Sequence, residues 1–196
     1  MPASQIAAEW VFLICIATFG AIRLPFHRRA RHVPVRFGKR DALDWIVRSA
    51  AVIGLGVLPV IYVIFKFPGF ANYPFLQPFV FVGAAVFAPG LWIIYRSQQD
   101  LGRNFSGHLE IRHAHQLITR GIYKSIRHPM YLGFALWAIA QALLLPNWIA
   151  GPAGLVGWLV LFSVRVAREE DMMIQEFGDE YRAYAKRTAR LLPHLF

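Results

Sequence analysis

A segment of polar, aromatic and basic side chains, residues 115–131, contains the groups best suited to chemistry. It includes Arg127-His128-Pro129, and a stretch without any charged residue follows, from Met130 to Val164. Proline is favoured in the first turn of a helix, where backbone N–H groups lack helical partners and attract an anion. The pattern predicts a polar site at the start of a membrane helix. The structural alternative is that His128 caps this helix and Arg127 extends to lipid headgroups.

A second charged cluster, Arg165 to Asp171, ends the same uncharged stretch. Arg165 and Glu169 are four residues apart, so on a helix they share a face and form an ion pair. An exposed pair of this kind contributes only about 0.3–0.5 kcal/mol. At the mouth of a protected cavity, where ionisable groups are costly, the pair would instead indicate function. The histidines have no cysteine or acid at a spacing that favours zinc, so we expect no metal site.

Composition places these clusters in a membrane protein. The chain has 196 residues, 57% of them apolar, and Trp45 to Tyr95 contains only two charged side chains. A crossing helix needs about 20 apolar residues. The net charge of +10 does not indicate nucleic acid, because excess Lys and Arg in such proteins mark cytoplasmic loops and contacts with anionic lipid. The sequence predicts an all-α integral membrane protein that contacts membrane lipid and binds no nucleic acid.

Five transmembrane helices account for the apolar segments. Pro146-Asn147 interrupts the uncharged stretch and favours a turn, so the last two helices form a tight hairpin. Beyond Val164, apolar residues recur at helical spacing and predict an amphipathic C-terminal helix on the membrane surface, interrupted at Gly178-Asp179. The predicted spans are residues 6–22, 45–65, 75–95, 130–145 and 148–164.

The basic residues give the orientation. All but two of the 21 Lys and Arg residues lie in 23–44, 96–130 and from 165 onward, which five spans bring to one face. By the positive-inside tendency this face is cytoplasmic, with the N-terminus outside and the C-terminus inside. We divide the chain into a three-span N-terminal segment with a basic cytoplasmic loop, 1–96, and a catalytic, cofactor-binding region, 97–196.

From Leu101 onward the chain resembles the isoprenylcysteine carboxyl methyltransferase family of integral membrane enzymes, in the form of a short, prokaryotic-like member. More distant relatives would be phospholipid N-methyltransferases and sterol reductases. The residues that carry the resemblance occur in order around the predicted hairpin. They are Leu101-Gly102-x-Asn104-Phe105-Ser106, His115-x-Leu117-Ile118-Thr119-x-Gly121-x-Tyr123, Arg127-His128-Pro129-x-Tyr131, Arg165, Glu169-Glu170 and Phe177-Gly178-Asp179-Glu180-Tyr181.

The resemblance implies that S-adenosylmethionine is the cofactor and binds at the cytoplasmic face. It assigns two catalytic positions, Arg165 facing the methyl acceptor and Glu169 completing the cofactor pocket. The positions it assigns to cofactor binding are Glu110, His115, Gln116, Leu117, Ile118, Tyr123, His128, Pro129, Met130, Tyr131 and Glu169.

The acceptor is expected to be lipophilic and to enter from the membrane. A carboxylate is favoured, because its reference pKa of about 3.3–3.7 leaves it ionised and no base is needed. Arg165 would then bind it through two parallel hydrogen bonds. A thiol or phospholipid acceptor, a lipid reductase and a non-enzymatic scaffold are the alternatives, and the oligomeric state stays open.

Overall fold

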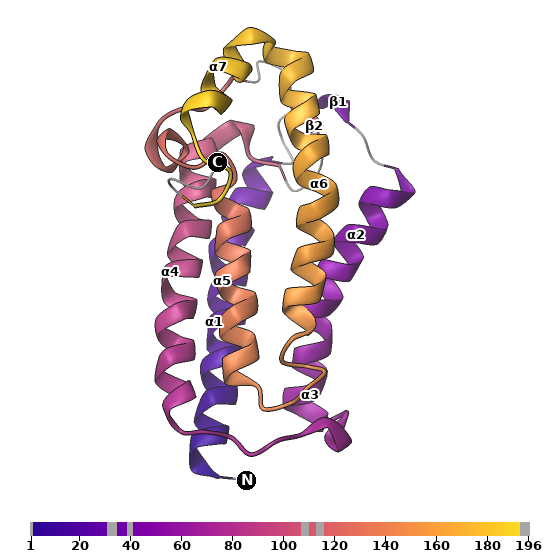
Figure 1. Ribbon diagram of the computed structural model, residues 1–196, viewed down its shortest axis with the longest axis vertical. Coiled ribbons are helices and arrows are strands. Elements are labelled where there is room, and N and C mark those ends of the chain that lie inside the picture. Colours follow the sequence, from indigo (N-terminus) through magenta and orange to yellow (C-terminus); the bar gives the residue numbers. More distant parts are fainter. Residues whose placement is uncertain (1, 31–34, 39–40, 107–109, 113–115, 193–196) are drawn as a thin grey trace.

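The computed structural model describes residues 2–30, 35–38, 41–106, 110–112 and 116–192. Within these residues the long helical segments lie alongside one another as an elongated bundle (Figure 1). Their bounds are α1, Ala3–Ala30; α2, Ala42–Val52; the π-helix η1, Ile53–Val57; α3, Leu58–Phe65; α4, Pro78–Leu101; α5, Pro129–Leu144; and α6, Ala153–Phe177. Short 3-10 turns are η2, Gly69–Ala71; η3, Gly102–Asn104; and η4, Gly121–Lys124.

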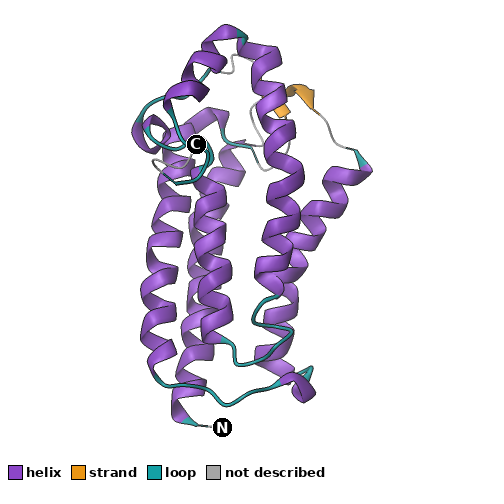
Figure 2. Cartoon of the chain, viewed as in Figure 1, coloured by secondary structure: helices purple, strands orange, loops and turns teal. Residues whose placement is uncertain are grey.

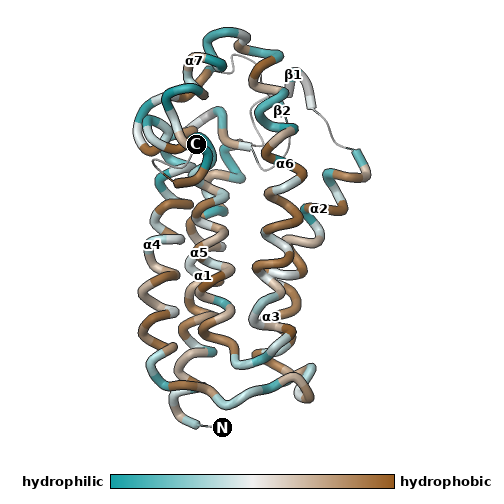
Figure 3. Tube along the Cα trace, in the orientation of Figure 1, coloured by the Kyte–Doolittle hydropathy of each residue, from teal (hydrophilic) through white to brown (hydrophobic). Residues whose placement is uncertain are grey.

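Three of these segments are long and apolar enough to cross a membrane: α1, the continuous run from Ala42 to Phe65, and α4. Helix α5 is apolar but shorter, and α6 has 25 residues with charged side chains in its second half. Hydrophobic residues follow the long helices, whereas hydrophilic ones gather at the end that carries the short helix α7, Asp179–Arg187 (Figure 3).

Several helix bounds differ from the expected spans. Helix α1 continues to Ala30 and α4 to Leu101, so both extend beyond their apolar parts. Helix α6 begins only at Ala153, because the Asn147 side chain folds the chain into a turn: its Oδ1 accepts hydrogen bonds from the backbone N–H groups of Ile149 (3.0 Å) and Ala150 (2.8 Å). The hairpin prediction was right, but its connection is longer than Pro146-Asn147.

Close contacts through glycine join the helices, as the glycines of the last span predicted. A Cβ at Gly157 of α6 would lie 2.7 Å from the carbonyl oxygen of Ala50 in α2, and one at Gly54 would lie 2.3 Å from that of Ala153. Helices α4 and α5 meet similarly at Gly90 and Gly133. The core contains buried apolar side chains from α1, α2, η1, α3, α4, α5 and α6.

A short antiparallel strand pair was not expected in the all-helical fold. Strand β1, Val35–Gly38, pairs with β2, Glu110–Arg112, with Gly38 opposite Glu110. The pair joins the basic segment after α1 to the segment after α4, and it lies beside the upper part of α6 (Figure 2). It thereby fixes the backbone at Glu110.

The basic segments gather at one end of the bundle, opposite the N-terminus (Figure 1). Helices α1, α4 and α6 end there, and α2 and α5 begin there. Gly178 has a φ of 54°, so it ends α6 and turns the chain into α7, as the sequence predicted.

Candidate active site

A cavity of about 480 Å³ opens at this end of the bundle. Its walls come from α1, α2, η1, α5, α6 and α7, together with the segment between α4 and α5. All but one of the site residues expected from the sequence line it; the exception, His115, lies outside the described residues. The ones that line it are Glu110, Gln116, Leu117, Ile118, Tyr123, His128, Pro129, Met130, Tyr131, Arg165 and Glu169.

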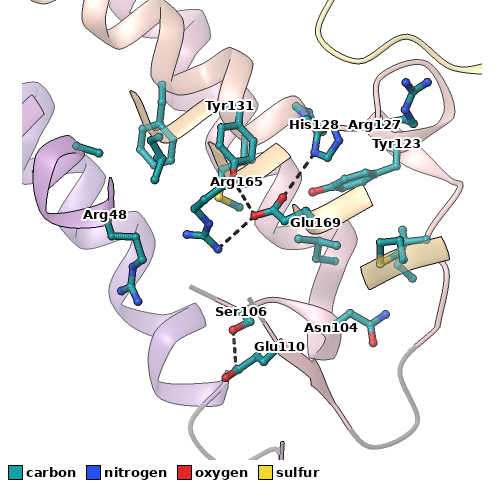
Figure 4. A pocket seen from close by; sticks show the side chains of 18 of the residues that line it. Arg48, Asn104, Ser106, Glu110, Tyr123, Arg127, His128, Tyr131, Arg165 and Glu169 are labelled. Carbon is teal, nitrogen blue, oxygen red and sulfur yellow. Dashed lines mark hydrogen bonds and ion pairs between the residues drawn. The ribbon is translucent and has the colours of Figure 1, made fainter. Parts of the chain in front are cut away.

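The Glu169 carboxylate is the centre of this cavity (Figure 4). The Tyr131 hydroxyl donates to its Oε1 (2.7 Å), and the Nη2 of Arg165 lies 3.2 Å from the same oxygen. The Nδ1 of His128 lies 3.6 Å from its Oε2. Burial alone would raise the pKa of Glu169, but the bond with His128 and the charge of Arg165 outweigh it and lower the pKa. Glu169 therefore presents a negative charge to the cavity.

Arg165 is anchored from a second side. Its Nε lies 3.5 Å from the Oδ1 of Asp44, a buried carboxylate in the first turn of α2, and Arg48 contacts the other oxygen at 3.8 Å. Arg165 itself is 8% exposed. The Arg165–Glu169 pair is thus a protected pair inside a cavity and not an ordinary surface ion pair.

Glu170, next to Glu169, faces away from the cavity centre and binds three cationic groups. Its oxygens lie 3.1 Å from the Nε of Arg127, 3.2 Å from the Nε2 of His128 and 2.6 Å from the Nη2 of Arg190. Burial opposes ionisation, but these bonds, led by that of His128, lower the pKa of Glu170 to about 2. Glu169 and Glu170, which are adjacent on α6, therefore share only one partner, His128. Their other partners are different residues.

The imidazole of His128 responds to both acids. Burial lowers its pKa, but the bonds with Glu169 and Glu170 outweigh burial and raise the pKa above 6.5. With a proton on each ring nitrogen, the side chain donates to Glu170 through Nε2 and directs its Nδ1–H toward the Glu169 carboxylate. His128 is the N-cap residue of α5, as the structural alternative predicted, but its side chain makes no capping hydrogen bond and contacts the two acids instead.

The chain after α7 is bound to the start of α5. The N–H groups of Arg127 and His128 donate to the carbonyls of Ala189 (2.8 Å) and Arg190 (3.0 Å). The Nη1 of Arg127 donates to the carbonyls of Ala185 (2.7 Å) and Thr188. Two results follow: the N–H groups of Arg127 and His128, directly before α5, are not free for an anion, and Arg127 does not extend to lipid headgroups.

Helix α7 covers the cavity with its apolar side. The Tyr184 hydroxyl donates to the carbonyl of Tyr123 (2.7 Å), and both Tyr181 and Tyr184 are 3% exposed and line the cavity. Burial raises the pKa of Tyr184 to about 12. The tyrosines that we expected to lie against the membrane surface therefore face the site, because the turn at Gly178 reverses the chain over it.

Three short contacts position the segment between α4 and α5. The Asn104 side chain makes two hydrogen bonds with the backbone of Gln116. Its Nδ2 donates to the carbonyl (3.1 Å), and its Oδ1 accepts from the N–H (3.4 Å). The Ser106 hydroxyl donates to Glu110 (2.6 Å). Gly121 has a φ of 61°, and there the Asp100 carboxylate accepts from the N–H of Ile122 (2.9 Å).

Several site residues were not predicted as such. Asn104 and Glu170 belong to the motifs that carried the resemblance, so their role could have been proposed from the sequence. Asp44, Arg48 and Arg23 lie in the first 96 residues, where no motif marked them. Among the residues that the structure describes, no group of three or more His, Cys, Asp or Glu side chains could hold a metal ion.

Long apolar helices define an integral membrane protein, with a cavity at one end of the bundle that charged, aromatic and apolar side chains line. A sequence profile of the isoprenylcysteine carboxyl methyltransferase family matches residues 81–175. A protein of Oryza sativa subsp. indica, named "Probable protein-S-isoprenylcysteine O-methyltransferase", is 35% identical over 66% of this chain and 67% of its own length. Protein-S-isoprenylcysteine O-methyltransferase B of Arabidopsis thaliana is 31% identical over 71% and 70%. The chain belongs to the isoprenylcysteine carboxyl methyltransferase family.

A solved structure supports the same fold. It is that of a eukaryotic intramembrane Ras methyltransferase, an isoprenylcysteine carboxyl methyltransferase, and it superposes with a TM-score of 0.53 at 22% identity. The match covers 80% of this chain and 54% of the other. The family resemblance seen from Leu101 onward is therefore confirmed.

Proposed function

We propose that the protein transfers a methyl group from S-adenosylmethionine to a lipophilic carboxylate that enters from the membrane. The observation that carries this proposal is Glu169: an ionised carboxylate, held by three side chains, that faces a cavity in a member of a methyltransferase family. The relatives are named for methylation of isoprenylcysteine, so we propose an acceptor of that chemical kind.

The side chains around the cavity suit this cofactor. Bound S-adenosylmethionine supplies a sulfonium-activated methyl group, so the protein has to align the reactants and exclude water. Glu169 would hold the positive charge of the sulfonium side. Tyr123, Leu117 and Ile118 would surround the apolar part of the cofactor, with Gln116, Glu110 and His115 at its polar groups. A volume of about 480 Å³ lies within the usual range of about 300–1,000 Å³ for small-ligand sites.

Arg165 would bind and orient the acceptor carboxylate. Its guanidinium is fixed by Asp44 and Glu169, which restricts its direction before a ligand arrives. A carboxylate is already ionised near neutral pH, so it would accept the methyl group without a base, with the sulfur–methyl bond breaking and S-adenosylhomocysteine leaving. Helix α7, through Tyr181 and Tyr184, would cover the reaction from water. A thiolate acceptor would use the same charge complementarity.

For the membrane arrangement we propose five crossings, with α5 and α6 as the fourth and fifth. At about 1.5 Å per residue, the 16 residues of α5 extend about 24 Å, close to the hydrocarbon thickness. The basic end would be cytoplasmic, with the N-terminus outside. Residues 97–196 would supply most of the cofactor site, and residues 1–96 the wall toward the acceptor.

The test is calorimetric titration of S-adenosylmethionine and S-adenosylhomocysteine into detergent-purified protein and its Glu169→Gln variant. The variant keeps the shape of the side chain but removes the charge, and it is expected to weaken S-adenosylmethionine binding by roughly 100-fold, as for loss of a charged hydrogen-bonding partner. Glu176→Gln is the control, because Glu176 lies on the same helix but pairs with Arg36 and does not line the cavity. Equal affinity in wild type and Glu169→Gln would refute the assignment of Glu169.

A further inference from the structure

Arg23, two turns before the end of α1, lines the cavity, and the described part of the chain supplies no ion-pair partner for its charge. Its Nη1 is buried and makes no hydrogen bond, and the described residues place no carboxylate within ion-pair distance of it. The guanidinium lies over the rings of Phe19 (5.6 Å) and Phe105 (5.5 Å). The rings hold the group in place, but they accept none of its hydrogen bonds. A buried charge without a partner is costly unless a ligand supplies one.

The acids around the cavity are engaged elsewhere. Asp44 contacts Arg48 and Arg165. Glu169 accepts from Tyr131 and pairs with Arg165, and Glu110 accepts from Ser106. Arg48 and Arg165 are also close enough to repel the charge of Arg23. Arg48 and Arg165 therefore share the acids of this side, and Arg23 is the arginine for which the described residues supply no ion pair.

A stripe of apolar cavity residues continues into the bundle from Arg23 on α1, and another continues from Arg48 on α2. Along α1 the cavity residues Ile16, Phe19 and Arg23 occur at helical spacing, so they share one face. Along α2 and η1 the order of charged and apolar cavity residues is opposite to that on α1. Arg48 comes first, and apolar residues follow as far as Leu55. The two helices run in opposite directions, so both arginines lie at the polar end and both stripes extend toward the membrane interior (Figure 1).

Figure 4 shows Arg48 and Arg165 reaching from different helices toward the same region of the pocket. Both contact Asp44, which fixes them at the border between the apolar stripes and the carboxylate of Glu169. A ligand that extends along the stripes would therefore present its head group to the arginines and, beyond them, to the cofactor side of the cavity.

We propose that Arg23, assisted by Arg48, is a specificity-determining residue that binds the anionic head of the acceptor together with Arg165, while the apolar tail follows the two stripes. This inference rests on the proposed function. Both arginines lie outside residues 81–175, so the family match does not assign them a role.

The test compares equilibrium binding of N-acetyl-S-farnesylcysteine with that of its primary amide, in protein saturated with S-adenosylhomocysteine. Wild type is expected to prefer the acid. Arg23→Gln is expected to weaken acid binding by roughly 10- to 100-fold, as for loss of a hydrogen bond to a charged group. It should leave the affinities for the amide and for S-adenosylhomocysteine unchanged. In turnover assays KM should rise more than kcat falls.

Acid binding by Arg23→Gln equal to that of wild type would overturn the inference, and so would equal affinity of wild type for acid and amide. If Arg23→Gln fails to fold, Arg23→Lys is tested instead. A lysine lacks the planar fork and should weaken acid binding alone, by roughly 3- to 10-fold; unchanged acid binding overturns the inference here too. The proposed function is judged separately, by whether wild type binds S-adenosylhomocysteine at all.

Discussion

Neutralising Glu170 should weaken the attachment of the C-terminal segment to the start of α5 and destabilise the fold. Glu170 connects Arg127 and His128 at the start of α5 with Arg190 beyond α7. Its pKa is lowered to about 2 from the ordinary 4.5. At about 1.36 kcal/mol per pKa unit this corresponds to at most about 3 kcal/mol. Since Arg190 is exposed and water screens its charge, we expect Glu170→Gln to lower the free energy of unfolding by about 1–2 kcal/mol.

The assay is thermal unfolding of detergent-purified protein followed by intrinsic fluorescence. For a chain of this size the expected loss corresponds to a decrease in Tm of about 2–8 °C at pH 7. Glu176→Gln is the control, since its exposed pair with Arg36 should contribute less than about 1 kcal/mol.

The pH dependence gives a second readout. A carboxyl whose folded pKa is depressed stabilises the protein above its unfolded pKa, and the contribution is lost as pH falls through the folded value. The difference in stability between wild type and Glu170→Gln should therefore shrink as pH falls from about 4.5 toward 2. Equal Tm values at pH 7, or a difference that stays constant over this interval, would refute the reasoning.

Two further changes test the cavity and the segment that forms its wall. Tyr131→Phe removes one hydrogen-bond donor from Glu169 but leaves Arg165 and His128 in place. Calorimetry should therefore show S-adenosylmethionine affinity lowered roughly fivefold, about 1 kcal/mol. An unchanged affinity would exclude a role for the hydroxyl. Gly121→Ala places a Cβ 2.2 Å from the Asp100 carboxylate at a φ of 61°, and should lower the free energy of unfolding by about 2–3 kcal/mol. Gly20→Ala, with no atom within 4 Å of the new Cβ, is its control and should be nearly neutral; equal Tm values for both variants would contradict the strain at Gly121.

The sequence predicted the helices well because their signals are local. Apolar stretches marked the long helices, and Gly178 marked the break before α7. The helix bounds were less accurate because α1 and α4 extend beyond their apolar parts and Asn147 delays the start of α6. The strand pair was missed because β1 and β2 are short and far apart in sequence, and no local pattern announces such a pairing.

The candidate site also contains residues that the sequence predicted and residues that it did not. Glu169, His128, Tyr131 and Arg165 were predicted because family motifs contain them. The Arg165–Glu169 pair followed from their four-residue spacing, but the contacts of Glu169 with His128 and Tyr131 depend on how α5 and α6 face each other, which spacing does not reveal. Arg23 and Asp44 were missed because they lie at the two ends of the basic segment 23–44, where charged residues are equally typical of a loop at the membrane surface. Only the folded chain places them at the cavity and beside Arg165.

His128 links formation of the site to docking of the C-terminal segment. Its Nε2 contacts Glu170, which holds Arg190, and its Nδ1 faces Glu169 in the cavity. Docking of Arg190 fixes Glu170, and a fixed Glu170 favours the doubly protonated ring that also binds Glu169. The raised pKa of His128 means that this stabilisation is fully present below the unfolded pKa and is lost as pH rises through the folded value. The imidazole of His128 thus joins the two adjacent acids of α6. Through Nδ1 it orients Glu169 in the cavity, and through Nε2 it holds Glu170, which secures the segment after α7.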